Sequence, residues 1–353
     1  MEQSFLAYLR GRTRQLPQVA VGIGDDAAVI DWPGSAASDQ PQLRQVACTD
    51  QILDGVDFRS EDQSLCDIGF KAMAINLSDI AAMGATPSSA LVTLALPAEN
   101  ATEIAGEVIA YMIEALALQG GERVLVIGVG SGYATAVLAE IAGEVYEGIL
   151  EAAQEYQVAI AGGDLSTYDG PLSISITILG WTEKPWLRTG AEEGDALFVT
   201  GALGGSLLGR HLRPEPRVEL AAKLKDKVNV HAAIDVSDGF SLDLDRMLAA
   251  SRMGAELELE TLPISEAAHQ FAGKSGRTPL EHAWSDGEDF ELIFCVAPEE
   301  AAIIESTDWG VPVTRVGKVV GRTGLWKRVA TSKFERVFPQ GFVHGETDVA
   351  ATN

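Results

Sequence analysis

Short apolar runs alternate with longer amphipathic stretches along most of the chain. In the first half, alternating apolar positions and β-rich runs predict strands over residues 19–23, 28–31, 46–52, 89–96, 158–161 and 172–179. Apolar residues three or four positions apart predict helices over residues 66–83 and 140–156. After Arg188 the pattern restarts, with predicted strands over 196–200, 232–236, 255–259, 290–296 and 313–319, and with helices near 217–225 and from Leu242. This interleaving lacks a strict βαβα order, which favours an α/β or α+β mixture over a doubly wound sheet.

The restart of the pattern predicts two domains. The run Trp181-Thr-Glu-Lys-Pro-Trp186 is typical of a loop, and it places the boundary near residues 182–190. A length of 353 residues also fits two domains at roughly 150 residues each. We therefore expect an N-terminal domain over 1–182, a C-terminal domain over 183–345 and a tail over 346–353.

The chain also contains a short direct repeat. Glu-Ile-Ala-Gly-Glu-Val occurs at 103–108 and again, 37 residues later, at 140–145. Removing residues 109–145 would join the first copy to Tyr146 and leave one continuous helix start. We therefore predict that 109–145 is an insertion with a strand, a turn and a helix.

The composition narrows the partners that this chain can have. Acidic residues number 51 and basic residues 26, which gives a net charge of −25. Such a surface repels phosphate backbones and anionic lipid, which argues against nucleic acid or a membrane as the main partner. Anionic small molecules remain possible substrates if metal ions lie between them and the protein.

Three cysteines without a CxxC pair argue against a zinc site or a disulfide framework: Cys48, Cys66 and Cys295. A sparse, odd number of cysteines fits the reducing cytoplasm. The N-terminus lacks a signal-peptide pattern, and no apolar run is long enough to cross a bilayer. We therefore expect a cytoplasmic protein.

Aspartates recur beside glycine or serine at the ends of the predicted strands. The motifs are Gly24-Asp25-Asp26, Thr49-Asp50, Leu77-Ser78-Asp79, Gly162-Gly163-Asp164, Asp235-Val-Ser-Asp238-Gly and Gly287-Glu288-Asp289. Each motif alone is typical of a turn, and Ser237 alone could cap a helix. Together they favour a site, because converging carboxylates repel one another and need cations. Oxygen ligands select Mg²⁺ or Ca²⁺, and Mg²⁺ commonly binds carboxylates together with substrate phosphates.

The familiar motifs of nucleotide chemistry are absent from the sequence. It contains no GxxxxGK[ST] P-loop and no HRD…DFG arrangement of protein kinases. Phosphoryl transfer that relies on positioning and metal electrostatics stays open.

Longer strings resemble the thiamine-monophosphate kinase family, within the superfamily of aminoimidazole ribonucleotide synthetase. They include Val21-Gly-Ile-Gly-Asp-Asp-Ala-Ala, Asn76-Leu-Ser-Asp-Ile-Ala-Ala-Met-Gly-Ala85, Ala161-Gly-Gly-Asp164, Arg188-Thr-Gly-Ala191 and Ser285-Asp-Gly-Glu-Asp-Phe-Glu-Leu292. The resemblance implies that a two-domain α/β protein, paired as a homodimer through the strands of its N-terminal domain, phosphorylates thiamine monophosphate with ATP and several Mg²⁺ ions.

The resemblance also assigns residues. It implies metal ligation by Asp26, Cys48, Thr49, Asp50, Asp79, Asp164, Asp235 and Asp238. It implies ATP contacts from Gly163, Asp164, Arg188 and Ser237, and a substrate site that includes Asp57, Glu288 and Phe342. The catalytic set consists of Asp26, Asp50, Asp79, Asp164 and Asp238. Lys71 is a possible helper in offsetting the repulsion between the two anions, but a lysine on a helix face is more often solvated or capping, and it is left out of the site.

One departure concerns the acceptor. Members of the family often carry Asp-x-x-x-x-Gly-x-His-Phe, whereas this chain has Asp57 in place of the histidine. A carboxylate cannot donate a hydrogen bond at neutral pH unless its pKa is raised. A related kinase with another phosphate acceptor is therefore an alternative.

Residues 109–145 suggest a second class of function. Arg123-Val-Leu-Val-Ile-Gly-Val-Gly-Ser-Gly-Tyr133 resembles the cofactor motif of S-adenosylmethionine-dependent methyltransferases, and the wider segment resembles protein-L-isoaspartate O-methyltransferase. A working cofactor site needs an acidic residue after the next strand, and here the chain continues into a helix instead. Methyl transfer and nucleotide binding without turnover are the alternatives to a kinase.

Overall fold

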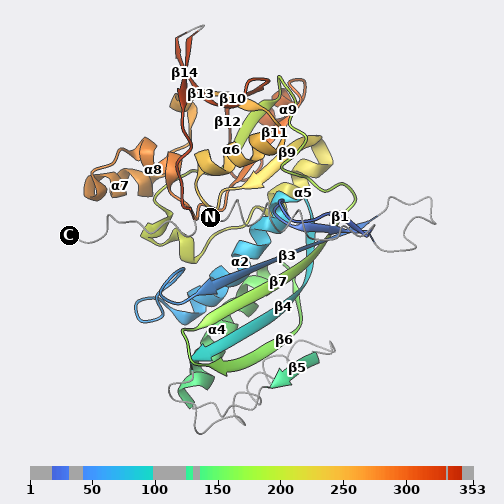
Figure 1. Ribbon diagram of the computed structural model, residues 1–353, viewed down its shortest axis with the longest axis vertical. Coiled ribbons are helices and arrows are strands. Elements are labelled where there is room, and N and C mark those ends of the chain that lie inside the picture. Colours follow the sequence, from blue (N-terminus) through green and yellow to red (C-terminus); the bar gives the residue numbers. More distant parts are fainter. Residues whose placement is uncertain (1–17, 32–42, 98–124, 130–135, 331–332, 344–353) are drawn as a thin grey trace.

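The computed structural model describes residues 18–31, 43–97, 125–129, 136–330 and 333–343, and these form two seven-stranded sheets. Figure 1 shows the sheets one above the other along the long axis, each with helices against it. The predicted mixed α/β fold is confirmed.

The first sheet belongs to the N-terminal half. Its order is β1-β2-β3-β7-β4-β6-β5. The strands are β1 (Val19–Val21), β2 (Ala28–Ile30), β3 (Arg44–Leu53), β4 (Thr86–Pro97), β5 (Leu125–Val129), β6 (Ala159–Tyr168) and β7 (Ser173–Thr182). Strand β5, from the Gly-rich segment, lies at the edge and pairs in parallel with β6.

Two helices cover one face of this sheet: α2 (Leu65–Ala82) and α4 (Ala136–Glu155). Their backbones meet at glycines, since a Cβ on Gly69 would lie 1.9 Å from the Val145 carbonyl oxygen. Ser64 caps α2 by accepting a hydrogen bond from the backbone N–H of Asp67. Both helices were predicted from their apolar spacing.

The second sheet has the order β14-β13-β10-β12-β8-β11-β9. Its strands are β8 (Ala196–Thr200), β9 (Val230–Asp235), β10 (Gly254–Leu257), β11 (Leu292–Val296), β12 (Val313–Val320), β13 (Gly324–Ala330) and β14 (Lys333–Val337). The helices are α5 (Val218–Lys227), α6 (Phe240–Ala250), α7 (Glu266–Ser275), α8 (Pro279–Ser285) and α9 (Ala301–Ser306), with 3₁₀ turns η2 (Ser206–Leu208), η3 (Arg210–Leu212) and η4 (Leu259–Thr261). The central strands β8 and β11 are buried along their whole length.

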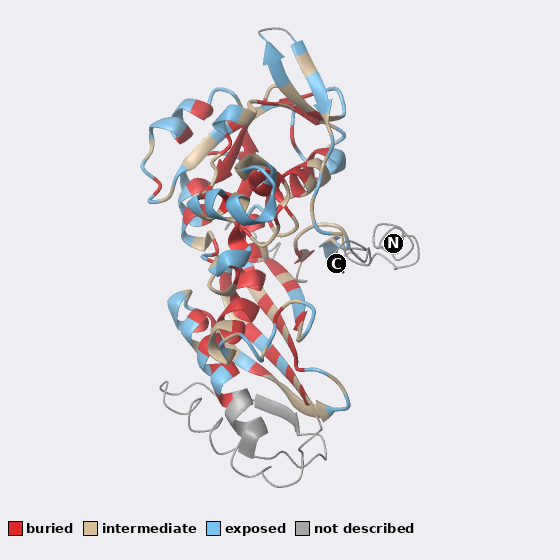
Figure 2. Ribbon diagram, turned by 90° about the vertical axis from the view of Figure 1, so that its left-hand side faces the viewer, coloured by how far each residue is buried: buried red, intermediate tan, exposed pale blue. Residues whose placement is uncertain are grey.

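Helix α2 joins the two halves. It packs on β3, β7 and α4 of the first half and on α5 and β9 of the second. Almost every residue from Ile68 to Ala82 is therefore buried, including the polar residues Lys71, Asn76 and Ser78. Figure 2 shows that buried residues continue across the junction between the two halves. The helix thus brings polar side chains into the interior where the halves meet.

Strand β6 differs from the prediction. Gly162-Gly163-Asp164 was expected at the end of a short strand, but β6 runs through it to Tyr168. Parallel pairing with β4 carries the strand through the glycines, and the register places Asp164 opposite Thr93. A Cβ on Gly163 would lie 1.8 Å from the carbonyl oxygen of Val92. The glycines therefore allow two strands to approach closely, and they do not end the strand.

Candidate active site at the junction of the two halves

Three of the predicted aspartates converge where the halves meet. Asp26 lies between β1 and β2, Asp79 lies on α2, and Asp235 ends β9. One oxygen from each carboxylate lies within 4.8 Å of the others, which is a spacing that a single metal ion could bridge. We call these residues the acid triad. Asp79 is half-buried. Asp235 is only 3% exposed, and the side chain of Asp26 is only 1% exposed.

The acid triad is short of positive charge. Arg188 donates from Nη2 to Asp26 Oδ1 over 2.6 Å, and Ser78 Oγ donates to Asp235 Oδ2 over 2.7 Å. Burial and the nearby carboxylates raise the pKa of Asp79 and of Asp235 well above the usual range. Two carboxylates about 4 Å apart repel by about 4 kcal/mol at an effective dielectric constant of about 20. A divalent cation would relieve this repulsion.

Two buried polar atoms at the triad have no hydrogen-bond partner among the described residues. They are Asp26 Oδ2 and Arg188 Nε. Buried polar groups are rarely left without a partner, and exceptions are often positions for an ion or ligand. Asp26 Oδ2 can only accept and Arg188 Nε can only donate. The first atom therefore suits a bound cation, and the second suits an anionic group beside it. Asp25 lies next to them, accepts the backbone N–H of Arg188 over 3.2 Å, and has its pKa raised to about 6 by burial and by Asp26.

A pocket of 420 Å³ adjoins the triad. Among the predicted site residues, those that line it are Asp50, Asp57, Ser237, Asp238, Glu288 and Phe342. Asp50 links pocket and triad, because its charge raises the pKa of Asp79. Asp238 also connects the two sites, because it lines the pocket and lies only three residues after Asp235 in the sequence. The acid triad therefore lies near the pocket, although none of its three members is among the residues that line it.

Of three neighbouring residues on β3 that were predicted as metal ligands, only one lines the pocket. The backbone N–H of Asp50 donates to Asn76 Oδ1 over 3.0 Å, and this fixes the strand against α2. The thiol of Cys48 donates to the Asn76 carbonyl, and burial raises its pKa, so it stays protonated. Thr49 Oγ1 donates to the carbonyl of Ile176. Neither Cys48 nor Thr49 lines the pocket, so of these three predicted ligands only Asp50 presents its side chain there.

Loops of the second half close the pocket by pairing with each other. Glu288 N donates to the Ser237 carbonyl over 2.7 Å, and Phe342 N donates to the Asp238 carbonyl over 2.9 Å. Glu288 has φ of 60°, a left-handed conformation that its surroundings must hold in place. Arg246 forms an ion pair with the Asp238 carboxylate. Glu288, Ser237 and Phe342 therefore occupy one wall.

Lys71 is the residue that the sequence interpretation left out of the site. It is 1% exposed, it lines the pocket, and its Nζ contacts Glu288 Oε1 at 2.6 Å and the Asp57 carbonyl at 3.0 Å. Its expected solvated role is wrong because the second half of the protein covers that face of α2. One signal was present in the sequence: Lys71 is the one charged or polar residue between Ile68 and Ile75, a stretch that is otherwise apolar on all sides of the helix.

Asp57 and Asp164 differ in their surroundings. The carboxylate of Asp57 lies at the pocket but accepts the backbone N–H of Leu53 over 2.8 Å, so it stabilises its own turn. Gly163 and Asp164 lie on β6, separated from β3 by β7 and β4. Three strand spacings correspond to about 14 Å. Among the described residues, Asp164 belongs neither to the acid triad nor to the pocket.

Comparison with known proteins identifies the class first. The family model for the N-terminal domain of AIR synthase related proteins matches residues 24–124 and 103–182, two pieces that overlap across the first repeat copy. The model for the C-terminal domain of the same class matches residues 186–326. Structures of a hydrogenase maturation protein, HypE of E. coli, share this fold with a TM-score of 0.62 at 19% identity, over 97% of this chain and 99% of that one.

The particular family follows from closer relatives. The thiamine-monophosphate kinase of Rhodopirellula baltica is 87% identical over 353 residues, which is all of both chains. That of Bacillus subtilis is 31% identical over 88% of this chain and 89% of its own. A crystal structure of AaThiL complexed with AMPPCP and TMP has a TM-score of 0.71 at 24% identity, over 97% of this chain and 95% of that one. The chain belongs to the thiamine-monophosphate kinase family. No described helix is long and apolar enough to cross a membrane.

Proposed function

We propose that this protein transfers the γ-phosphoryl group of ATP directly to the phosphate of thiamine monophosphate, which yields thiamine diphosphate. The observation that carries the proposal is an acid triad spaced for a metal ion near an acidic pocket in a member of this kinase family. The structure of a relative in complex with AMPPCP and TMP supports both substrates.

The residues of the acid triad fit magnesium. All three offer carboxylate oxygens, which Mg²⁺ prefers, and Asp26 Oδ2 has no partner among the described residues. Asp26, Asp79 and Asp235 would hold one ion, and we propose that Asp50 and Asp238 serve further ions. Bound Mg²⁺ would neutralise phosphate charge. Metal contacts of Cys48, Thr49 and Asp164, and ATP contacts of Gly163 and Asp164, stay predictions from the family resemblance.

The protein's own groups would align the two substrates. The acceptor is already an anion, so the reaction needs positioning more than it needs a base. Arg188 lies beside the triad with an unpartnered Nε, and it would donate to a phosphate oxygen. Ser237 at the pocket wall is proposed to contact ATP.

The pocket suits a cationic aromatic ring. Its walls carry the carboxylates of Asp50, Asp57, Asp238 and Glu288, and the ring of Phe342 is 54% exposed at its mouth. The thiazolium of thiamine monophosphate would be attracted by these carboxylates and would stack on the ring. Asp57 is engaged by its own turn, so nothing here favours a different phosphate acceptor.

Release of ADP in a coupled assay tests the proposal. With ATP, Mg²⁺ and thiamine monophosphate we expect turnover that EDTA abolishes, and weaker turnover with phosphate monoesters that lack the ring. Absence of turnover with intact nucleotide binding would support a binding protein instead. Calorimetry with S-adenosylmethionine tests methyl transfer, for which we expect no heat of binding.

A homodimer is the second part of the proposal. Helices cover one face of the first sheet, and the opposite face carries Leu91 at 46% exposure and Trp181 at 36%. Thr177 donates to Thr49 on this face. A second copy of the chain would cover this mixed surface. Sedimentation should show a dimer, and Leu91→Glu should shift it toward a monomer. A cytoplasmic location is also proposed, because all three cysteines are free.

A further inference from the structure

We propose that Lys71 is a positioning residue that fixes the carboxylate of Glu288 and thereby sets the preference of the pocket for a cationic acceptor. This inference rests on the proposed function and adds a residue to it. Lys71 belongs to α2 of the first half, whereas Glu288 belongs to the loop before β11 of the second. Their ion pair therefore crosses the pocket wall from one half of the protein to the other.

The burial of Lys71 indicates a specific role. It is among the largest side chains that are fully buried, with 1% exposure. A buried ammonium is costly unless it is paired and hydrogen-bonded. Among the described residues, Nζ contacts Glu288 Oε1 at 2.6 Å and the Asp57 carbonyl at 3.0 Å. An ammonium has three donors, so one stays available to a group in the pocket.

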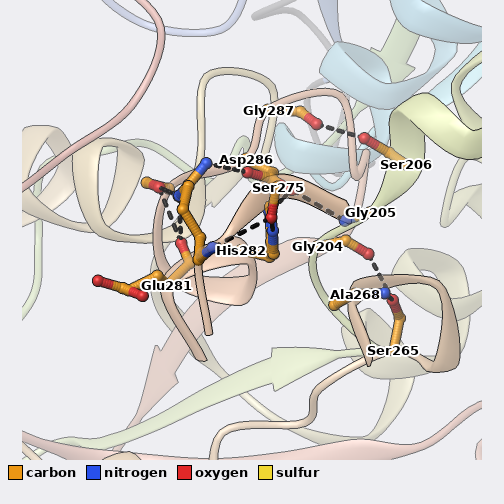
Figure 3. Close-up of polar contacts among 12 residues, drawn as sticks. Gly204, Gly205, Ser206, Ser265, Ala268, Ser275, Glu281, His282, Asp286 and Gly287 are labelled. Atoms are coloured by element: carbon orange, nitrogen blue, oxygen red, sulfur yellow. Dashed lines mark hydrogen bonds and ion pairs between the residues drawn. The ribbon is translucent and has the colours of Figure 1, made fainter. Parts of the chain in front are cut away.

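The backbone around Glu288 is fixed independently of Lys71. Figure 3 shows Asp286 held by His282 and by the Gly205 N–H, and Gly287 held by Ser206. The Asp286 carboxylate lies 2.8 Å from His282 Nδ1 and 3.1 Å from the Gly205 nitrogen. Ser206 Oγ donates to the Gly287 carbonyl over 2.6 Å. The second half thus fixes the loop, and Lys71 fixes the direction of the Glu288 carboxylate.

The charges that line the pocket make the Lys71–Glu288 pair important for the choice of acceptor. Lys71 is the one lysine or arginine among the described residues that line the pocket, against four carboxylates. A positioned Glu288 would present its second oxygen to the ring cation of the acceptor. Without Lys71 the carboxylate would turn away, and discrimination between acceptors with and without that cation would fall.

Kinetic comparison of Lys71→Met with the unchanged enzyme tests the inference. We expect KM for thiamine monophosphate to rise by about tenfold or more, as when one partner of a buried charge pair is lost, with KM for ATP unchanged. The preference for thiamine monophosphate over a phosphate monoester without the ring should fall similarly. In a Glu288→Gln background the same change should have little further effect, because the two residues act as a unit.

The control is Lys225→Met. Lys225 also reaches from the second half to the first, where its Nζ donates to Thr182 Oγ1 over 3.1 Å, but it does not line the pocket. Its substitution should leave both KM values unchanged. If Lys71→Met does not fold, Lys71→Met with Glu288→Leu removes both charges and should restore folding while acceptor discrimination stays lost.

Two results would overturn the inference. One is an equal rise of both KM values in Lys71→Met, and the other is retained discrimination in the double variant. Failure of the proposed function looks different, because the unchanged enzyme would then not turn over thiamine monophosphate at all.

Discussion

Two groups of three carboxylates among the described residues lie in or near the interior and can be compared. The acid triad consists of Asp26, Asp79 and Asp235. A second group, which we call the anchored acids, consists of Asp286, Asp289 and Glu291, and it lies under the loop that carries Glu288. The two groups have the same chemistry and similar burial, but they differ in the partners around them.

The anchored acids are matched by basic groups. Arg217 binds Glu291 with two hydrogen bonds of 2.7 and 2.6 Å. Arg210 pairs with Asp289, and the Gly204 N–H donates to it over 2.8 Å. Asp286 contacts Arg277 at 3.0 Å. Each of the three acids thus has a basic partner, although burial still raises the pKa of Asp289 to about 7. We interpret the group as a structural support of the segment that carries Glu288.

The carboxylates of the acid triad have fewer basic partners than the anchored acids. Arg188 contacts one of its members, an oxygen of Asp26 has no partner among the described residues, and the pKa values of Asp79 and Asp235 are raised. Natural proteins break the rules of charge balance mainly at functional sites. We therefore expect charge balance to separate a structural acidic cluster from a catalytic one, and the two groups differ in it.

The largest expected effect is on catalysis. Asp79→Asn keeps the shape of the side chain but removes one charge of the triad, and we expect kcat to fall by roughly 10³-fold. Without metal, its melting temperature should stay equal or rise, because the change relieves repulsion. Steady-state kinetics and thermal melting measure both effects. Loss of stability together with activity would mean that the triad is structural.

The matching experiment on the anchored acids should affect stability instead. Arg217→Met leaves Glu291 buried at 1% exposure without its bidentate partner. We expect the free energy of unfolding in urea to fall by about 3–5 kcal/mol. Saturating kcat of the folded fraction should change little. A fall in kcat as large as that of Asp79→Asn would contradict the division of roles.

A pH series sharpens the comparison further. Because the folded state raises the pKa of Asp79 and Asp235, their contribution to stability is present at low pH and is lost as pH rises through the folded pKa values. The metal-free protein should therefore melt at lower temperature at about pH 8 than at about pH 6. Mg²⁺ competes with protons for these oxygens, so its stabilising shift should be larger at the higher pH. Asp79→Asn should lose part of this pH dependence, and the part that Asp235, Asp243 and Asp289 contribute should remain, because burial raises the pKa of each of them as well.

The smallest effect is expected at the repeat. We propose that residues 109–145 are an insertion, because their deletion joins the copy at 103–108 to Tyr146 in place of the copy at 140–145. Kinase activity should stay within about twofold, since insertions at sheet edges are tolerated. Deletion also removes β5 and exposes β6, so light scattering should be followed for aggregation. An unfolded deletion variant would show that the segment is integral.

Local patterns in the sequence predicted much of the framework. The spacing of Ile68, Ala72 and Ile75 predicted α2, and alternating residues predicted β3. The aspartate motifs predicted a convergent site, and three of them do meet in the triad. These aspartates are far apart in the sequence. Most of them lie at the ends of predicted strands, however, and strand ends can meet at one edge of a sheet.

Long-range packing decided what the sequence could not predict. Gly162-Gly163-Asp164 is predicted at a strand end because aspartates beside glycine or serine recur at the ends of the predicted strands, but the close approach of β4 requires glycine there. Lys71 is interpreted as solvated or capping because most lysines on a helix face are, and periodicity reports only one face of a helix. Which elements cover the remaining faces depends on how the second half docks, and no local pattern contains that information.

The packing of helix α2 limits which positions of this protein can tolerate substitution. The first sheet, α4 and the second half all pack against it, and it carries Asp79, Lys71 and Asn76 to the site. A substitution anywhere between Ile68 and Ala82 therefore meets several neighbours at once. In a library of random variants selected for activity, this segment should tolerate the fewest changes, well below exposed positions of α5. The geometry of the reaction centre is thereby protected by the same packing that holds the protein together.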